Sequence, residues 1–183
     1  MEAIPRQLAA ALPPNSIRLG ARVVRVAPGE VTLSTGEELN AKSVVVAVEG
    51  QVAAHLLRDT IFSSGQGTTC LYFTAPRPHI AQPLLVLNGD GRGPINNLCF
   101  PTVAAPSYGP GEKSLVSVTV LGTGNDPVRL MSEVRTQLVE WFGTVVQGWR
   151  HLRTYSIPYA LPTQSPPALN VPERPVRRQS GIY

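Results

Sequence analysis

The side chains of this chain that could ligate a metal do not form a recognisable pattern. His55, His79 and His151 are its only histidines, and they fall on three separate predicted elements. A metal site needs ligands that converge on one point, so we expect core or surface histidines here. The chain has no Gly-x-Ser-x-Gly elbow, no paired-cysteine metal pattern and no His-Glu-x-x-His sequence. The sequence motifs therefore assign no catalytic residue and no metal ligand.

A glycine-rich stretch at residues 89–93, Gly-Asp-Gly-Arg-Gly, could bind an anion through its backbone N–H groups. No helix is predicted after it, and Pro94 removes one donor, so a hairpin loop is the favoured interpretation. The chain has neither a Walker loop nor a Gly-x-Gly-x-x-Gly sequence after a strand. A self-contained dinucleotide site is therefore not expected.

The elements that would position any site begin with a helix and a run of strands. Residues 1–12 are rich in Leu and Ala and end at a pair of prolines, which predicts a short helix. From Ser16 to Val48 apolar and polar residues alternate between turns such as Pro28-Gly29, which predicts a three-stranded meander. Its last segment, Ser43–Val48, is apolar on both faces, so we expect a buried, parallel strand there.

The rest of the chain predicts an antiparallel sheet with one long helix. A short helix is predicted over residues 51–58, and Pro- and Gly-rich linkers separate the predicted strands. These strands cover residues 68–74, 84–87, 95–103, 114–121 and 152–157. Apolar residues at three- and four-residue steps predict an amphipathic helix over Pro127–Phe142, with Asp126 as its N-cap and Gly143 at its C-terminal end.

Composition excludes several classes of protein. Apolar residues make up 43% of the chain, too many for a disordered protein. No apolar run approaches the roughly 20 residues of a membrane-spanning helix, and the first residues do not resemble a secretion signal. Cys70 and Cys99 are far apart in apolar runs, so we expect buried free thiols and a cytoplasmic location.

The net charge of +4 arises at the end of the chain, where five arginines from Arg150 onward face only Glu173. Nucleic-acid binders usually show a basic stripe with lysines and interleaved aromatic residues. This chain has 2 lysines in all, and prolines interrupt its basic end. We therefore expect no nucleic-acid partner. A solvated tail, or arginines that pair with something outside this chain, explains the charge.

One long-range pattern is more specific than any motif above. It consists of Met1-Glu2-Ala3-Ile4-Pro5, Leu8, Ile17-Arg18-Leu19, Val23–Val26, Val31-Thr32-Leu33, Gly36, Ala41–Ala47, Tyr155–Pro162 and Gly181-Ile182-Tyr183. This order resembles the interior of the flavin-containing amine oxidase superfamily, which includes phytoene desaturases and protoporphyrinogen oxidases. The resemblance implies an α+β fold. It would comprise part of an FAD-binding domain (the three-stranded β-meander plus the buried strand), a β-rich substrate domain and one long amphipathic helix.

The resemblance also implies a division into domains. Residues 1–50 would be a partial FAD-binding domain, residues 51–160 a substrate-binding domain, and residues 161–183 a proline-rich return toward the FAD domain. The family's N-terminal Rossmann motif and its C-terminal Gly-Asp segment, which hold much of the flavin, have no counterpart here. We therefore expect an interior fragment of an FAD-dependent oxidoreductase.

Few residues of the family's site carry over to this chain. Val23, Ala47 and Val48 match positions near the FAD, although Val23 is equally explained as a core valine. Tyr155 and Tyr159 match the strand that lines the substrate cavity, and a structural role explains them as well. Many amine-oxidising members place a lysine near the flavin. Residues 68–87 contain none, which leaves the substrate class open.

The implied activity is hydride transfer from a C–N or C–C bond of a small-molecule substrate to flavin. The fragment hypothesis predicts weak or no FAD binding by the isolated chain, and no activity. The alternative is a non-catalytic binding or assembly module that self-associates or pairs with another chain through its exposed domain face. A gene remnant without function is the third hypothesis.

Overall fold

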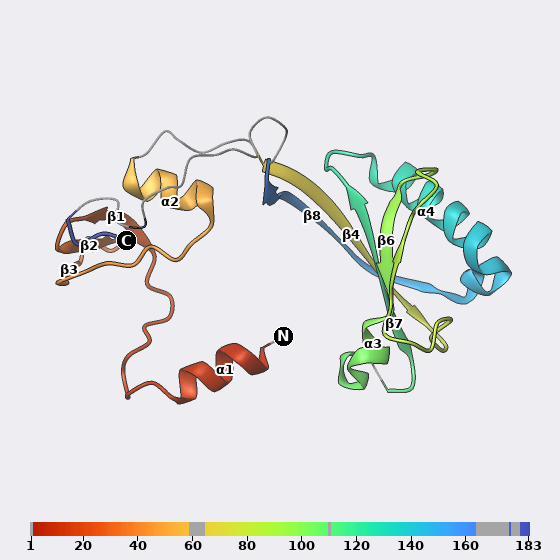
Figure 1. Cartoon of the computed structure of the whole chain (residues 1–183), viewed down its shortest axis with the longest axis horizontal. Helices are drawn as coiled ribbons and strands as arrows, with labels where there is room; N and C mark the ends of the chain where they lie inside the picture. The colour runs from red at the N-terminus through yellow and green to blue at the C-terminus, as the bar shows by residue number, and fades with distance from the viewer. Residues whose placement is uncertain (1, 59–64, 110, 164–175, 177–179) are drawn as a thin grey trace. The chain divides into compact units, whose positions relative to one another are not determined.

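The computed structural model describes residues 2–58, 65–109, 111–163, 176 and 180–183 (Figure 1). The chain divides into two compact units. Unit 1 consists of residues 1–62 and 167–183, and unit 2 consists of residues 63–166. Both helices and strands are present, which agrees with the predicted α+β class.

Unit 1 is built around the predicted meander. Strands β1 (Val23–Ala27), β2 (Glu30–Leu33) and β3 (Glu38–Asn40) pair antiparallel in that order. The tight turn between β1 and β2 depends on Gly29, whose φ of 81° favours glycine. The three-stranded meander predicted from the sequence is therefore confirmed.

Two helices also belong to unit 1, and both were predicted. Helix α1 (Ala3–Ala10) has no buried residue, whereas α2 (Gly50–Leu57) buries Leu56. Figure 1 shows α2 beside the meander. In the described part of the chain, no helix combines the length and hydrophobicity needed to cross a bilayer.

The segment Ser43–Val48 differs from its prediction. The predicted strand does not form: the segment makes one isolated parallel bridge, between Val44 and Ile182, so only the parallel direction agrees with the prediction. The Val44 N–H donates to the Gly181 carbonyl at 2.8 Å, and the Tyr183 N–H donates to the Val44 carbonyl at 2.9 Å. Its burial was predicted wrongly, since Val45 is 73% exposed and Val48 49% exposed. A strand is buried on both faces only where layers cover both, and the described residues of unit 1 do not cover Val45.

Unit 2 contains a five-stranded sheet with the order β5-β6-β7-β4-β8, and every neighbouring pair is antiparallel. The strands are β4 (Gly65–Ala75), β5 (Leu85–Leu87), β6 (Ile95–Cys99), β7 (Ser114–Leu121) and β8 (Arg150–Pro162). The predicted antiparallel sheet is confirmed. Strand β6 ends earlier than predicted because Pro101 opens a short helix, α3 (Pro101–Ala104).

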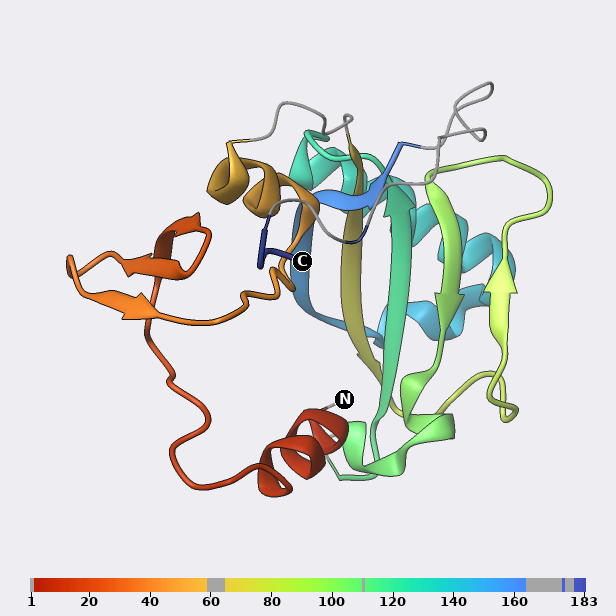
Figure 2. The ribbon, with the colours of Figure 1, turned by 60° about the vertical axis from the view of Figure 1, so that its left-hand side comes forward.

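Helix α4 (Pro127–Phe142) has the predicted bounds and covers one face of this sheet (Figures 1 and 2). The Arg129 N–H donates to Asp126 Oδ1 at 2.7 Å, which is the predicted N-cap, and Gly143 ends the helix with a φ of 75°. The core between helix and sheet includes Leu71, Phe73, Ala75, Leu98, Val116, Val118, Leu130, Val134 and Leu138.

Gln137 is a buried polar residue of α4 that the sequence pattern did not indicate. Its side chain is 4% exposed and faces the glycine-rich loop before β6. Gln137 Oε1 accepts from the Ile95 N–H at 2.9 Å, and Gln137 Nε2 donates to the Arg92 carbonyl at 2.7 Å. A Cβ at Gly93 would collide with this amide. The loop is therefore fastened to the helix by one side chain, and residues 88–95 form the hairpin connection predicted from the sequence.

We expect Gln137→Leu to lower the free energy of unfolding by about 1–3 kcal/mol, because it leaves the buried Ile95 N–H without its partner, whereas the Arg92 carbonyl keeps the Asn88 side chain as a donor. Thr136→Val is the matched control on the same helix, since its hydroxyl bonds only to the Ser132 carbonyl at an exposed site. The control should stay within about 0.5 kcal/mol of the wild type. Urea unfolding measures both variants, and equal losses would contradict the role of the amide.

Candidate functional site

A cavity of about 620 Å³ lies in unit 1 between β1 and α2. Two of the residues predicted to contact the cofactor, Val23 and Val48, line it together. The third, Ala47, is not among its lining residues. The full lining is Ala21, Arg22, Val23, Val24, Val48, Gln51, Val52, His55 and Leu56. The structure therefore brings together two positions that are 25 residues apart in the sequence.

The chemistry of this cavity suits binding better than catalysis. Its walls are mostly valines together with Leu56, which offer a flat apolar ring a place to bury its faces. Arg22, Gln51 and His55 add polar groups, and Arg22 carries a positive charge suited to a phosphate. No carboxylate or cysteine lines the cavity. It therefore offers no nucleophile and no carboxylate that could act with His55 as an acid–base pair.

Unit 2 presents a second candidate surface, on the sheet face opposite α4. Cross-strand partners point to the same side of a sheet, so the register identifies the side chains of this face. We call it the open face. Its residues are Thr68, Cys70, Tyr72, Thr74, Leu85, Leu87, Asn97, Cys99, Leu115, Ser117, Thr119, Leu121, Arg150, Arg153, Tyr155 and Ile157. Of these only Thr74, at one end of the face, is buried, whereas Leu71, Val118 and Leu98 on the other face are at most 1% exposed.

Tyr155 lies at the centre of an aromatic cluster on the open face. Its ring meets Tyr72 of β4 edge to face, with ring centroids 5.8 Å apart and an interplanar angle of 85°. The guanidinium carbon of Arg153 lies 5.4 Å from the centroid of the Tyr155 ring. Arg153 is also the cross-strand partner of Tyr72, so the three side chains lie together on this face. The predicted residue Tyr155 therefore lies on an exposed face of the sheet.

Tyr159 occupies a different environment from Tyr155. It is half-buried near the end of β8, and its ring covers Gly65 of β4, where a larger residue would collide with it. Such an aromatic residue packed over a strand glycine supports the sheet. The structure thus does not place Tyr159 in the Arg153–Tyr155–Tyr72 cluster.

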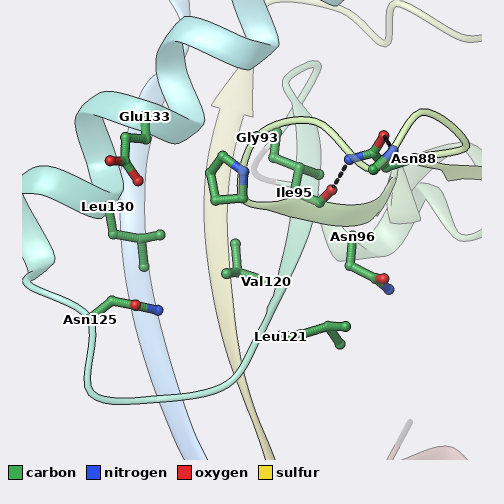
Figure 3. A pocket seen from close by; sticks show the side chains of 11 residues that line it. Asn88, Gly93, Ile95, Asn96, Val120, Leu121, Asn125, Leu130 and Glu133 are labelled. Carbon is green, nitrogen blue, oxygen red and sulfur yellow. Dashed lines mark hydrogen bonds between the residues drawn. The ribbon is translucent and has the colours of Figure 1, made fainter.

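A third hollow, shown in Figure 3, lies at the end of the sheet beside the glycine-rich loop. Its volume is about 410 Å³, and Asn88, Asn96, Asn125 and Glu133 supply its polar side chains. Asn88 donates to the Ile95 carbonyl at 2.7 Å, which stabilises the loop itself. Glu133 is the one titratable lining residue, and it pairs with Arg129 at 2.7 Å. This hollow therefore has a structural explanation and no catalytic pair.

Both cysteines are free and half-buried, and both lie on the open face. Burial raises the pKa of the Cys99 thiol above its ordinary value, because a thiolate is poorly solvated there. A neutral thiol is a poor nucleophile. Both cysteines were predicted to be buried free thiols; both are free, and neither is fully buried. No group of three or more His, Cys, Asp or Glu side chains among the described residues could hold a metal ion.

A model of one protein family, the flavin containing amine oxidoreductases, matches residues 1–183. The chain belongs to this family. No curated protein sequence matches it. The family membership confirms the resemblance inferred from the order of helix, meander and late strands.

Solved structures resemble this flavin containing amine oxidoreductase chain in fold. Reduced UDP-galactopyranose mutase superposes with a TM-score of 0.65 at 11% identity, covering 87% of this chain and 39% of its own. PF1083 protein from Pyrococcus furiosus gives 0.57 at 15% identity, covering 74% and 36%. An oxidoreductase from Methanosarcina mazei gives 0.54 at 18% identity, covering 75% and 36%. The chain therefore spans less than half the length of these proteins.

The main feature that sequence reasoning missed is the partnership of Arg153 and Tyr72 with Tyr155. Alternation along each strand indicated which residues share a face, but it could not indicate the register between β4 and β8. That register includes irregularities between Gln66 and Thr68 and between Tyr72 and Phe73. The pairing therefore became visible only in the folded sheet.

We expect the alkylation rate of Cys99 to rise at a higher pH than that of an ordinary thiol. The variant Cys70→Ser leaves Cys99 as the sole thiol, and its reaction with iodoacetamide can be followed across pH. Because the folded-state pKa is raised, the midpoint should shift down when the same variant is unfolded in urea. A midpoint that does not change on unfolding contradicts the effect of burial.

Proposed function

We propose that this chain supplies part of an FAD-dependent oxidoreductase. Bound flavin would accept a hydride from a C–N or C–C bond of a small-molecule substrate. Family membership supports this proposal, and the observation that carries it is the shared cavity of Val23 and Val48. Both of these residues were selected from the sequence as cofactor positions, and both line one cavity whose apolar walls and arginine suit part of FAD.

In this proposal unit 1 binds the adenosine end of FAD. The valines and Leu56 would cover the faces of the adenine ring, and Arg22 would meet the nearest phosphate. Ala47 does not line the cavity, and it would contribute only by helping to position Val48, the next residue in the chain. The cavity fits this end of the cofactor in both hydrophobicity and charge. The described residues of unit 1 contain no glycine-rich turn between a strand and a helix for the rest of the pyrophosphate.

Unit 2 would carry the substrate in this proposal. Its open face offers aromatic and aliphatic side chains on a rigid sheet, with α4 supporting the opposite face. Tyr155 would contact the substrate directly, and Tyr159 would hold the end of β8 in place. Residues 1–50, 51–160 and 161–183 would then correspond to partial FAD domain, substrate domain and return segment.

The chain would need further protein to complete the flavin site. The solved structures that resemble it are more than twice as long as the part it covers. We therefore expect the isolated chain to bind FAD weakly and to lack oxidase activity. A cytoplasmic location suits a flavoenzyme of this kind.

A second candidate function is a binding or assembly module, and exposed apolar residues favour it. Ile4 and Leu8 of α1 are 69% and 65% exposed, and Val45 is 73% exposed. Such residues attract partners or further copies of the chain. Sedimentation equilibrium would distinguish this candidate: stable self-association in place of FAD binding supports a module, whereas a monomer supports the first proposal.

We expect the isolated chain to bind FAD with low affinity and FMN less well, because FMN lacks the adenosine that the unit 1 cavity would hold. Equilibrium dialysis measures both ligands. Val48→Glu should abolish the preference for FAD, since it places a negative charge in the apolar wall that would cover the adenine ring. Val45→Glu is the matched control, because Val45 lies in the same exposed segment and does not line the cavity. Equal binding of FMN and FAD by the wild type would refute the cavity assignment.

A further inference from the structure

The open face of unit 2 has a charge pattern that selects its ligand. Its charged residues are two arginines of β8, Arg150 and Arg153, and none is Asp or Glu. Among the residues that the structure describes, no carboxylate lies within ion-pair distance of the Arg153 guanidinium. The other interaction described for Arg153 is its position over the Tyr155 ring. A surface otherwise made of apolar, aromatic and uncharged polar groups thus presents cations and no anion, and Arg153 is the cation at the aromatic cluster.

The geometry fixes where this cation can act. Tyr72 and Tyr155 stand edge to face, and Arg153 lies over the Tyr155 ring, so its guanidinium stays at the aromatic surface. Stacking on a ring leaves the N–H groups at the edge of the guanidinium available to a planar anion. A molecule that stacks on the tyrosines would therefore present its charged end to Arg153.

We infer that the open face binds an apolar or aromatic molecule that carries a carboxylate, with the carboxylate on Arg153 and the apolar part against Tyr72 and Tyr155. The planar guanidinium of Arg153 matches a carboxylate in charge and in shape. A protonated amine would meet a like charge at this position. In the complete enzyme the anionic end of the substrate would thus lie here, and the bond to be oxidised would lie away from Arg153.

This inference rests on the proposed function only for the identity of the ligand as a substrate. The binding site itself is a property of unit 2, whereas the FAD cavity is a property of unit 1. Titration with a carboxylate needs no flavin, and the dialysis with FAD needs no substrate. A negative result in the carboxylate titration therefore does not change how the FAD dialysis is interpreted, and the reverse also holds.

The test is an NMR titration of the labelled full chain with phenylacetate, 2-phenylacetamide, phenethylamine and phenyl phosphate. We expect phenylacetate to shift the resonances of Tyr72, Tyr155 and Arg153. It should bind at least tenfold more tightly than the neutral amide, a difference of about 1.4 kcal/mol. Phenethylamine should bind no better than the amide. This comparison uses the wild type and does not depend on any variant folding.

Arg153→Gln should weaken phenylacetate binding at least tenfold and leave binding of the amide unchanged. Arg77→Gln is the matched control, because Arg77 is exposed in unit 2 after β4 and lies outside the open face. Its removal should not affect either ligand. If both variants lost phenylacetate affinity equally, the loss would reflect the net charge of the protein, and the proposed site would be wrong.

Three other results also overturn the proposal. These are tighter binding of phenethylamine than of phenylacetate, tighter binding of phenyl phosphate, and shifts that lie outside the open face. The absence of any shift with phenylacetate at solubility-limited concentration overturns it as well.

Discussion

A sheet has two faces, and the described part of unit 2 covers only one of them with a long helix. Helix α4 buries Val134 and Leu138 against the strands, and this contact builds the core that holds the sheet together. The alternation of each strand then sends the remaining side chains to the opposite side. The open face, with its Arg153–Tyr155–Tyr72 cluster, is therefore a consequence of the same packing that stabilises the unit.

The elements of this fold followed from local patterns, whereas the sites depended on pairing between distant segments. Helix α4 was predictable to the residue because Asp126, Pro127 and Gly143 mark its ends independently of the rest of the chain. The exposure of Val45 was not predictable, since burial depends on which layers lie next to a segment. The contacts of Gln137 with residues 92 and 95 likewise join segments that only the folded sheet brings together.

The candidate cofactor cavity shows a useful intermediate case. Val23 and Val48 were selected because the chain resembles flavin-containing amine oxidases, and the spacing of two valines would not have identified them. The structure adds three polar residues around them: Arg22, which directly precedes β1, and Gln51 and His55 of α2. The family resemblance thus selected the two valines, and the fold showed which polar residues line the cavity beside them. Tyr159, selected in the same way, has a packing role over Gly65.

The account depends most on unit 1 binding the adenosine end of FAD. The most direct test is an NMR titration of the labelled chain with FAD, with the shifted backbone resonances assigned to residues. We predict that the shifts gather at Arg22, Val23, Val48 and the start of α2 and spare the open face. Shifts confined to unit 2, or no shift at any residue of this cavity, would contradict the account.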